Sequence, residues 1–308
     1  MKALVTGGAG FIGSHVVDAL VERGDEVTVV DDLSTGKREN LAGPGAAAKL
    51  VEADIRDGTA MRDLVDRVRP QAIFHLAAQI DVRKSTADPA WDAGVNVLGT
   101  INMLQAALEA GVDRFVNTST GGAIYGEGRI LPAPEDHPQA PEAPYGQSKF
   151  SAEGYCDLYS RLHGLSTVSL RYGNVYGPRQ DPLGEAGVIA IFCGRLLEGS
   201  PPTVFGTGEQ TRDYVYVGDV VRANLAAAGS HANGAFNIGL GVQTSVLELV
   251  EALREISESD GFEPEFAPPR LGEVQHIAID PARALAELGW EPHITLRDGL
   301  ERTLASLR

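Results

Sequence analysis

A short apolar strand that runs directly into a glycine-rich turn constrains this chain more than any other feature. Residues 2–5 are followed by Gly7, Gly10 and Gly13, and a helical pattern continues from Ser14. The first glycine permits a tight turn, the second lets backbone N–H groups approach a pyrophosphate, and the third lets the helix pack closely on the sheet. This order of elements predicts a dinucleotide site at the amino end of the helix.

Two acidic residues follow the next predicted strand, at the position where a dinucleotide-binding fold contacts ribose. The strand spans residues 26–30 and is followed by Asp31 and Asp32. A carboxylate there can bind both hydroxyls of the adenosine ribose and would repel the 2′-phosphate of NADP. We therefore predict NAD as the cofactor, against the alternative of a glycine-rich turn beside an acidic surface loop. Lys37 and Arg38 in the same loop could reach a 2′-phosphate, which keeps NADP as the competing cofactor.

Charge and cysteine content narrow the classes of partner. A formal net charge of −16 disfavours binding to nucleic acid or to an anionic membrane. Cys156 and Cys193 are too few for a disulfide framework, and no apolar run reaches the length of a transmembrane helix. We therefore expect a cytoplasmic protein. The histidines show no metal-ligand spacing, so no metal site is predicted.

Alternating strand and helix patterns predict the fold class. Strands are expected at residues 3–5, 26–30, 49–52, 72–75, 114–118 and 166–172, and helices at 13–23, 59–69, 92–110 and 148–163. This alternation is typical of an α/β fold, a Rossmann-type doubly wound parallel sheet. Residues 42–48 are expected to form a surface loop.

The alternation breaks after residue 172, which predicts a second domain. Short strands are expected at 201–208 and 213–217, and helices at 218–228, 243–256 and 281–288. We predict that residues 1–172 form the NAD-binding domain, with 218–245 returning to it. Residues 173–308 would mainly form a smaller, discontinuous C-terminal substrate domain.

A tyrosine and a lysine four residues apart suggest acid–base chemistry. Pro144 suits a first helical turn, and the spacing of Tyr145 and Lys149 places both side chains on one helix face. The ammonium and the positive charge of a bound nicotinamide would both lower the pKa of the phenol, so that it could act as a base. The alternative is an ordinary pair on a helix surface.

Further motifs occur in a fixed order along nearly the whole chain. They are TGGAGFIG at 6–13, ADI at 53–55, HLAAQ at 75–79, NVLGT at 96–100, STGGAIYG at 119–126, YGQSK at 145–149, LRYGNVYGPRQ at 170–180 and TRDYVYVGD at 211–219. Together with Asp31, these motifs resemble the extended short-chain dehydrogenase/reductase superfamily. Within it, the chain resembles the NAD-dependent nucleotide-sugar epimerases typified by UDP-glucose 4-epimerase.

The resemblance implies which residues bind the two ligands. For NAD they are Gly7, Gly10, Phe11, Ile12, Gly13, Asp31, Asp32, Asp54, Ile55, Ala77, Ala78, Gln79, Asn96, Tyr145 and Lys149. For the nucleotide sugar they are Asn174, Val204, Phe205, Arg212, Arg270 and Glu273. Arginine suits a diphosphate because its guanidinium can donate two parallel hydrogen bonds. The alternative is that the arginines pair with surface carboxylates.

One position departs from the family pattern. Members usually have Ser or Thr four residues before the tyrosine of the V-Y-G tripeptide, where this chain has Gly121. Ser119 and Thr120 are the nearest hydroxyls, and we predict Thr120 as the catalytic one; the alternative is that both cap a turn. Sugar 4,6-dehydratases of the superfamily carry an acidic pair at the next two positions. Gly122 and Ala123 stand there instead, which disfavours a dehydratase.

The implied activity is inversion at C4 of a UDP-hexose, with UDP-glucose and UDP-galactose as the default pair. UDP-glucuronate or a UDP-N-acetylhexosamine is the nearest alternative, and Leu183, which is not a cation, mildly favours a neutral sugar. A 4,6-dehydratase and a non-catalytic NAD-binding protein are the remaining alternatives. The family also implies a homodimer formed by the helices at 92–110 and 148–163.

Overall fold

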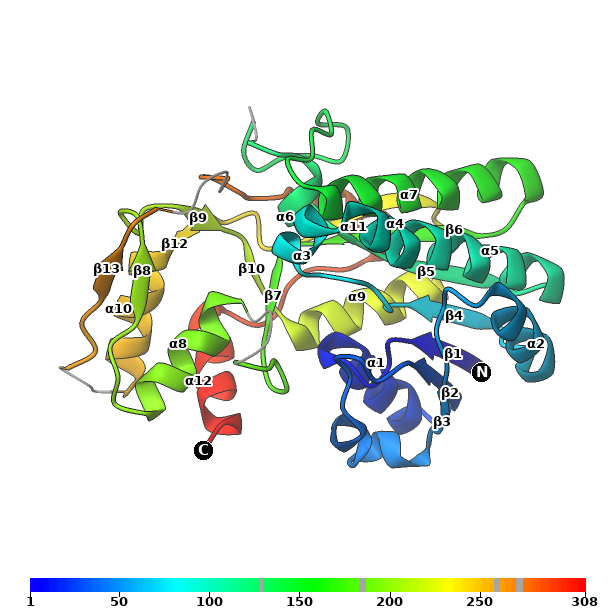
Figure 1. Cartoon of the computed structure of the whole chain (residues 1–308), viewed down its shortest axis with the longest axis horizontal. Coiled ribbons are helices and arrows are strands. Elements are labelled where there is room, and N and C mark those ends of the chain that lie inside the picture. The colour runs from blue at the N-terminus through cyan, green and yellow to red at the C-terminus, as the bar shows by residue number, and fades with distance from the viewer. Residues whose placement is uncertain (128–129, 183–186, 258–260, 270–273) are drawn as a thin grey trace.

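A seven-stranded parallel sheet forms the centre of the computed structural model, which describes residues 1–127, 130–182, 187–257, 261–269 and 274–308 (Figure 1). The strand order is β11-β6-β5-β4-β1-β2-β3. The strands are β1 (Lys2–Thr6), β2 (Glu26–Asp31), β3 (Lys49–Glu52), β4 (Ala72–His75), β5 (Arg114–Thr120), β6 (Thr167–Tyr172) and β11 (Gly234–Ile238). The order reverses between β1 and β4, and a crevice at such a reversal is where ligands bind in this class of fold. The predicted doubly wound sheet is confirmed.

The edge strand β11 is the main element of this sheet that the sequence analysis missed. It is short and contains a glycine, and it pairs in parallel with β6, so that Phe236 lies opposite Leu170. The other six strands occur within one or two residues of the predicted ranges. Because β11 comes from residues 234–238, the chain returns to the sheet after leaving it at Tyr172.

Helices cover both faces of the sheet (Figure 1). Val5 and Phe74 pack on one face with α1 (Phe11–Glu22) and α9 (Val217–Gly229). Their neighbours Leu4 and Ile73 pack on the other face with α2 (Gly58–Val68), α5 (Gly99–Ala110) and α7 (Pro144–His163). Neighbouring strand residues point to opposite faces, so a strand buried on both sides is a continuous apolar run, as these strands are.

Several shorter elements refine the predicted boundaries. The helix expected at 92–110 consists of α4 (Pro89–Ala93), the π-helical turn η3 (Gly94–Leu98) and α5, and it is preceded by α3 (Val82–Ala87). The expected surface loop at 42–48 follows one 3₁₀ turn, η1 (Arg38–Leu41), and contains a second, η2 (Pro44–Ala47). A short helix, α6 (Gly121–Ile124), follows β5 directly.

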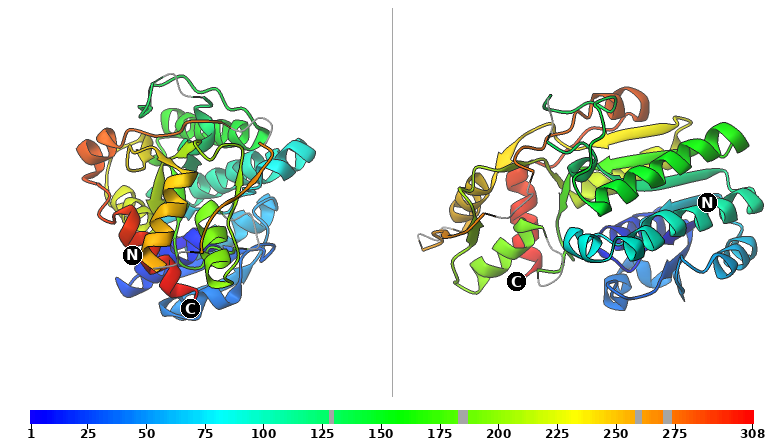
Figure 2. Two further views of the ribbon diagram at one scale, coloured as in Figure 1. Left: turned by 90° about the vertical axis from the view of Figure 1, so that its left-hand side faces the viewer. Right: turned by 45° about the horizontal axis from the view of Figure 1, so that its top comes forward.

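A smaller group of elements lies beside one end of the sheet (Figures 1 and 2). It contains the strand pairs β7 (Asn174–Tyr176) with β10 (Tyr214–Tyr216), β8 (Thr203–Phe205) with β13 (Glu265–Ala267), and β9 (Thr211–Arg212) with β12 (Thr244–Ser245). Its helices are α8 (Val188–Leu197), α10 (Val246–Ser257) and α12 (Leu296–Ser306), while α11 (Ala282–Leu288) packs on β11. The helices α8 and α12 were not predicted, and the predicted domain boundaries stay a prediction. None of the helices described is long and apolar enough to span a bilayer.

Candidate active site

The glycine-rich turn between β1 and α1 is shaped to admit a phosphate. Gly7 has a φ of +67°, and a Cβ there would lie 2.6 Å from the backbone nitrogen of Ala77. A Cβ on Gly13 would collide with the carbonyl oxygen of Gly7, whereas one on Gly10 would meet only that oxygen, at 3.1 Å. No described side chain caps the amino end of α1, which begins at Phe11. The backbone N–H groups there therefore fit the pyrophosphate of NAD.

Asp31, at the end of β2, lies against this turn. Its carboxylate accepts hydrogen bonds from the backbone N–H groups of Ala9 and Leu33, both at 2.9 Å. Burial raises the pKa of Asp31, while these two hydrogen bonds act in the opposite direction. Asp31 thus organises the glycine-rich turn, and the exposed Asp32 binds Ser34.

The basic residues that could have favoured NADP are engaged elsewhere. Lys37 lies 2.7 Å from a carboxylate oxygen of Asp181, and Arg38 lies 2.5 Å from one of Glu52. Both pairs are exposed, so they hold the side chains weakly. A 2′-phosphate would have to compete with these carboxylates and with the charge of Asp31.

Two further predicted NAD residues form one buried cluster. Gln79 and Asn96 each donate a side-chain hydrogen bond to Oδ1 of Asp92, at 2.7 and 3.0 Å. Asn96 also bonds the backbone of Gln79 in both directions. Asp92 is fully buried, and sequence reasoning missed it because it was counted only as the start of a helix.

The remaining predicted NAD residues lie on the loops that follow β3 and β4 and at the start of α1. The Asp54 carboxylate binds Arg56, which holds the pKa of Asp54 below its usual value. Ile55 is buried in the core, and the Ala77 N–H donates to the Thr6 hydroxyl at 3.2 Å. Ala78 is half-buried beside it, whereas the side chains of Phe11 and Ile12 pack toward the smaller group of elements.

Helix α7 carries Tyr145 and Lys149 in its first two turns. It begins at Pro144, which suits a first helical turn, and so starts before the expected range of 148–163. The Tyr145 N–H donates to the Ser85 hydroxyl at 3.2 Å. Lys149 is 3 % exposed, and burial lowers its pKa to about 8. Burial raises the pKa of Tyr145 to about 12, so the predicted lowering is not a property of the protein alone. Desolvation outweighs the hydrogen bond with Thr120, which acts to lower the pKa of Tyr145, and the negative charge of Asp92 raises that pKa further.

The structure distinguishes the two hydroxyls near the departure at Gly121. The Thr120 side chain hydrogen-bonds Tyr145, whereas the Ser119 hydroxyl is buried and has no partner among the described residues. A Cβ on Gly121 would lie 2.7 Å from Cδ1 of Ile279, so a serine or threonine does not fit there.

The predicted substrate residues are only partly brought together. Asn174 follows β6, and its Oδ1 is buried without a partner in the described chain, 3.4 Å from where a Cβ of Gly122 would lie. Thr120 Oγ1 lies 3.8 Å from the same point, so Asn174 and Thr120 face one region.

The other predicted substrate residues differ in which of their groups could contact a ligand. The Arg212 guanidinium donates to the carbonyl oxygens of Thr211 and Gln275. Val204 was predicted to bind the nucleotide sugar, but its side chain is fully buried in the core of the smaller group, so only its backbone could face a ligand. Phe205 is half-buried. Arg270, Glu273 and Leu183 lie outside the described residues. Within the described ranges, no group of three His, Cys, Asp or Glu side chains could hold a metal ion.

Comparison with known proteins gives consistent matches over the full chain. Residues 3–239 match the model of the NAD dependent epimerase/dehydratase family. The UDP-glucose 4-epimerase of Mycolicibacterium smegmatis is 46% identical over 312 residues, covering 100% of this chain and 99% of that protein.

Two solved structures are similar throughout. One is the UDP-glucose 4-epimerase of Thermotoga maritima with UDP-glucose, at a TM-score of 0.96 and 49% identity, covering 100% of this chain and 98% of that chain. The other is the UDP-glucose 4-epimerase of Thermus thermophilus in complex with NAD, at a TM-score of 0.92 and 43% identity, covering 99% and 98%.

Proposed function

This chain belongs to the NAD dependent epimerase/dehydratase family, and from that membership we propose that it is an NAD-dependent 4-epimerase that interconverts UDP-glucose and UDP-galactose. The observation that supports it most is the Tyr145 hydroxyl, hydrogen-bonded to Thr120 and carried one helical turn from Lys149. These groups lie at the carboxyl edge of the sheet, as the glycine-rich turn and Asp31 do.

Each of these side chains has a defined task in the proposed reaction. Tyr145 accepts the proton of the sugar's 4-hydroxyl and later returns it. Thr120 forms a hydrogen bond to the oxygen of that 4-hydroxyl. Lys149 favours the phenolate by its charge and binds the nicotinamide ribose. NAD, when bound, supplies a reversible hydride acceptor for C4, so that the 4-keto sugar can be reduced again on its other face.

The glycine-rich turn and Asp31 are proposed to hold the pyrophosphate and the adenosine ribose of NAD. Gln79 would line the ribose and diphosphate of NAD and Asn96 would face the nicotinamide side, and Asp92 accepts a hydrogen bond from each of these two amides. Arg212 and Asn174 are proposed to bind the diphosphate and the sugar, with Arg270 and Glu273 assigned from the sequence pattern alone.

A 4,6-dehydratase would need an acid and a base beside Thr120. Gly122 and Ala123 occupy those positions and carry no ionisable group. The nearest polar side-chain atom to a Cβ on Gly122 would be the neutral Oδ1 of Asn174. The site therefore has no described group there to move the C5 proton or expel the C6 hydroxyl.

We also propose a homodimer in the cytoplasm. Apolar side chains remain exposed on the helical layer of α4, η3 and α7, at Trp91, Leu98, Tyr155 and Leu162. A second copy of the same layer would cover them, as expected for a two-fold interface. The cytoplasmic location rests on the two cysteines, which are both buried and unpaired.

Proton NMR on a panel of nucleotide sugars tests the proposed activity. Purified protein is incubated separately with UDP-galactose, UDP-glucuronate and UDP-N-acetylglucosamine, and the configuration at C4 is read from the coupling constants of the product. We expect UDP-galactose to be converted to UDP-glucose and the other two to react at least tenfold more slowly. Faster inversion of either of the others would change the assigned sugar, and loss of the C6 hydroxyl would identify a dehydratase.

A further inference from the structure

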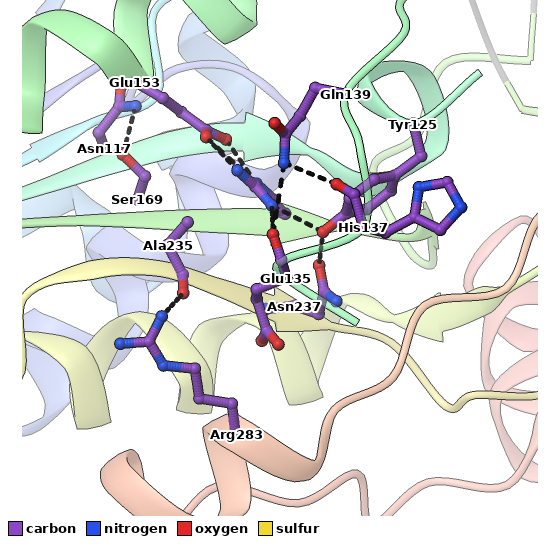
Figure 3. Close-up of polar contacts among 11 residues, drawn as sticks. Asn117, Tyr125, Glu135, His137, Gln139, Glu153, Ser169, Ala235, Asn237 and Arg283 are labelled. Atoms are coloured by element: carbon purple, nitrogen blue, oxygen red, sulfur yellow. Dashed lines mark hydrogen bonds and ion pairs between the residues drawn. The ribbon is translucent and has the colours of Figure 1, made fainter. Parts of the chain in front are cut away.

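A buried ion pair lies on the catalytic helix, one turn beyond Lys149. Glu153 of α7 faces Arg171 of β6, and their side chains are only 7 % and 6 % exposed. Arg171 donates from Nη2 to Oε2 at 2.7 Å and from Nε to both carboxylate oxygens at 3.0 and 3.1 Å. Figure 3 shows Glu153 at the edge of a connected polar network.

Arg171 also joins the turn that carries Thr120. Its Nη1 donates to the Tyr125 hydroxyl at 2.7 Å and to the Glu135 carbonyl oxygen at 3.0 Å. Tyr125 ends the short helix that starts directly after Thr120, and its own hydroxyl donates to Asn237 of β11 at 2.8 Å (Figure 3). One guanidinium therefore connects the helix of Tyr145 and Lys149, the turn after β5 and the edge strand.

Burying an ion pair to hold a helix in place carries a large desolvation free energy. Removing two charges from water costs several kcal/mol per ion, and apolar residues of similar size often stabilise a fold as well or better. The charges of Glu153 and Arg171 therefore need a reason beyond packing. Residues four apart on a helix are neighbours, so the carboxylate of Glu153 lies where it acts on the ammonium of Lys149.

We propose that Glu153 and Arg171 are positioning residues, which fix Lys149 against the Thr120 turn and supply it with a partly neutralised negative charge that keeps its ammonium protonated during the reaction. This rests on the proposed function, in which Lys149 must be charged to favour the Tyr145 phenolate. Arg171 limits the effect, because an unpaired carboxylate at this position would disfavour the Tyr145 phenolate by like-charge repulsion.

Other ionisable groups also surround Lys149, and they influence its pKa together with Glu153 and Arg171. Asp92 faces it from α4, Cys156 and Tyr145 share its helix, and His75 lies near it on β4. Burial lowers the pKa of Lys149 to about 8, while Cys156, Glu153 and Asp92 act in the opposite direction. A change confined to Glu153 or Arg171 leaves those other groups in place.

The pKa of Lys149 can be measured directly, without turnover. The chain has only five lysines, Lys2, Lys37, Lys49, Lys84 and Lys149, so ¹³C labelling of lysine gives few signals. Lys149→Met assigns the signal of interest, and its ε-carbon shift is followed from pH 6 to 11. The ordinary pKa of a lysine side chain is about 10.4, whereas burial lowers the pKa of Lys149 to about 8.

The two single variants should move this pKa in opposite directions. Glu153→Gln removes the negative charge and leaves Arg171, so the pKa of Lys149 should fall by about one unit or more. Arg171→Gln leaves the carboxylate unbalanced, so the pKa should rise by about one unit. Asp157→Asn, an exposed position one turn further along α7, is the matched control and should shift it by less than about 0.3 units.

A double variant keeps the proposal testable if a single variant does not fold. Glu153→Gln with Arg171→Gln buries no net charge, and its Lys149 pKa should lie between those of the single variants. Shifts of the same sign, or shifts below about 0.3 units in the variants that fold, would overturn the proposal and leave the pair a structural contact. Failure of the proposed function would instead appear as wild-type protein that does not invert C4, whatever the NMR titration shows.

Discussion

His75 gives a prediction whose size follows from the structure. The residue ends β4 and is 1 % exposed. The Thr100 hydroxyl donates to the Asn96 carbonyl oxygen, so it can only accept from Nε2–H of His75, at 3.1 Å. Nδ1 then accepts from the Thr6 hydroxyl, at 2.8 Å. The site thus satisfies a neutral imidazole, and burial, with the charge of Lys149, lowers the pKa of His75 to about 3.

This shift makes folding depend on pH in one direction. The unfolded chain binds a proton at His75 below pH 6.5, whereas the folded protein does not until about pH 3. Stability contributed by the neutral histidine is therefore complete above pH 6.5 and is lost progressively as the pH falls toward 3. At about 1.4 kcal/mol per unit, the loss is about 3 kcal/mol by pH 4.5 and about 5 kcal/mol in total.

Urea unfolding of the wild type and of His75→Gln, at pH 7 and pH 4.5, measures this effect. Glutamine does not titrate, and the carboxylates titrate similarly in both proteins, so the difference between the two proteins isolates the histidine. We expect the variant to be less stable at pH 7, because it loses hydrogen bonds, and the difference to shrink by about 3 kcal/mol at pH 4.5. A difference that is the same at both pH values would refute the reasoning.

Three other predictions follow from the site. Thr120→Val should lower kcat about a hundredfold with little change in KM, because one positioned hydrogen-bond donor is lost. The kcat of Ser119→Ala should stay within a few-fold of the wild-type value. Steady-state kinetics measures both variants, and the reverse ranking would move the role to Ser119. Cofactor-free protein should bind NADP at least tenfold more weakly than NAD in a calorimetric titration, because Asp31 is proposed to face the adenosine ribose, and equal affinities would contradict that proposal. Gly121→Ala should destabilise the fold by about 1–3 kcal/mol, because the added Cβ would clash with the side chain of Ile279. An unchanged melting temperature would contradict this, because it would show that Ile279 moves aside at no cost in stability.

Local patterns in the sequence were sufficient for much of the fold. The apolar run before Gly7 and the alternating segments up to Tyr172 predicted six of the seven strands, because each is a short buried run bounded by turn residues. The edge strand β11 was missed because its five residues include a glycine and only its pairing with β6 makes it a strand. The helices α8 and α12 were missed because their apolar faces pack on segments far away in the sequence, in the core of the smaller group. A local pattern does not contain such distant contacts.

The sequence pattern predicts which residue types the candidate site contains, but it does not contain their electrostatics. The spacing of Tyr145 and Lys149 placed both on one helix face, yet the direction of the tyrosine pKa depends on burial, which the spacing does not contain. The burial of Val204 and the links from Arg171 to Glu153 and Tyr125 likewise arise only when segments far apart in the sequence meet.

The fate of a deuterium label at C4 tests the central claim most directly. UDP-galactose deuterated at C4 is incubated with the protein in ordinary water, and the UDP-glucose formed is analysed by NMR and mass spectrometry, with Tyr145→Phe as the inactive control. If the hydrogen at C4 leaves and returns within the closed site, the product keeps the deuterium at C4 and free NAD is not required. A product that has exchanged its label with water would contradict the account, because C4 would then have been inverted by proton transfer with solvent.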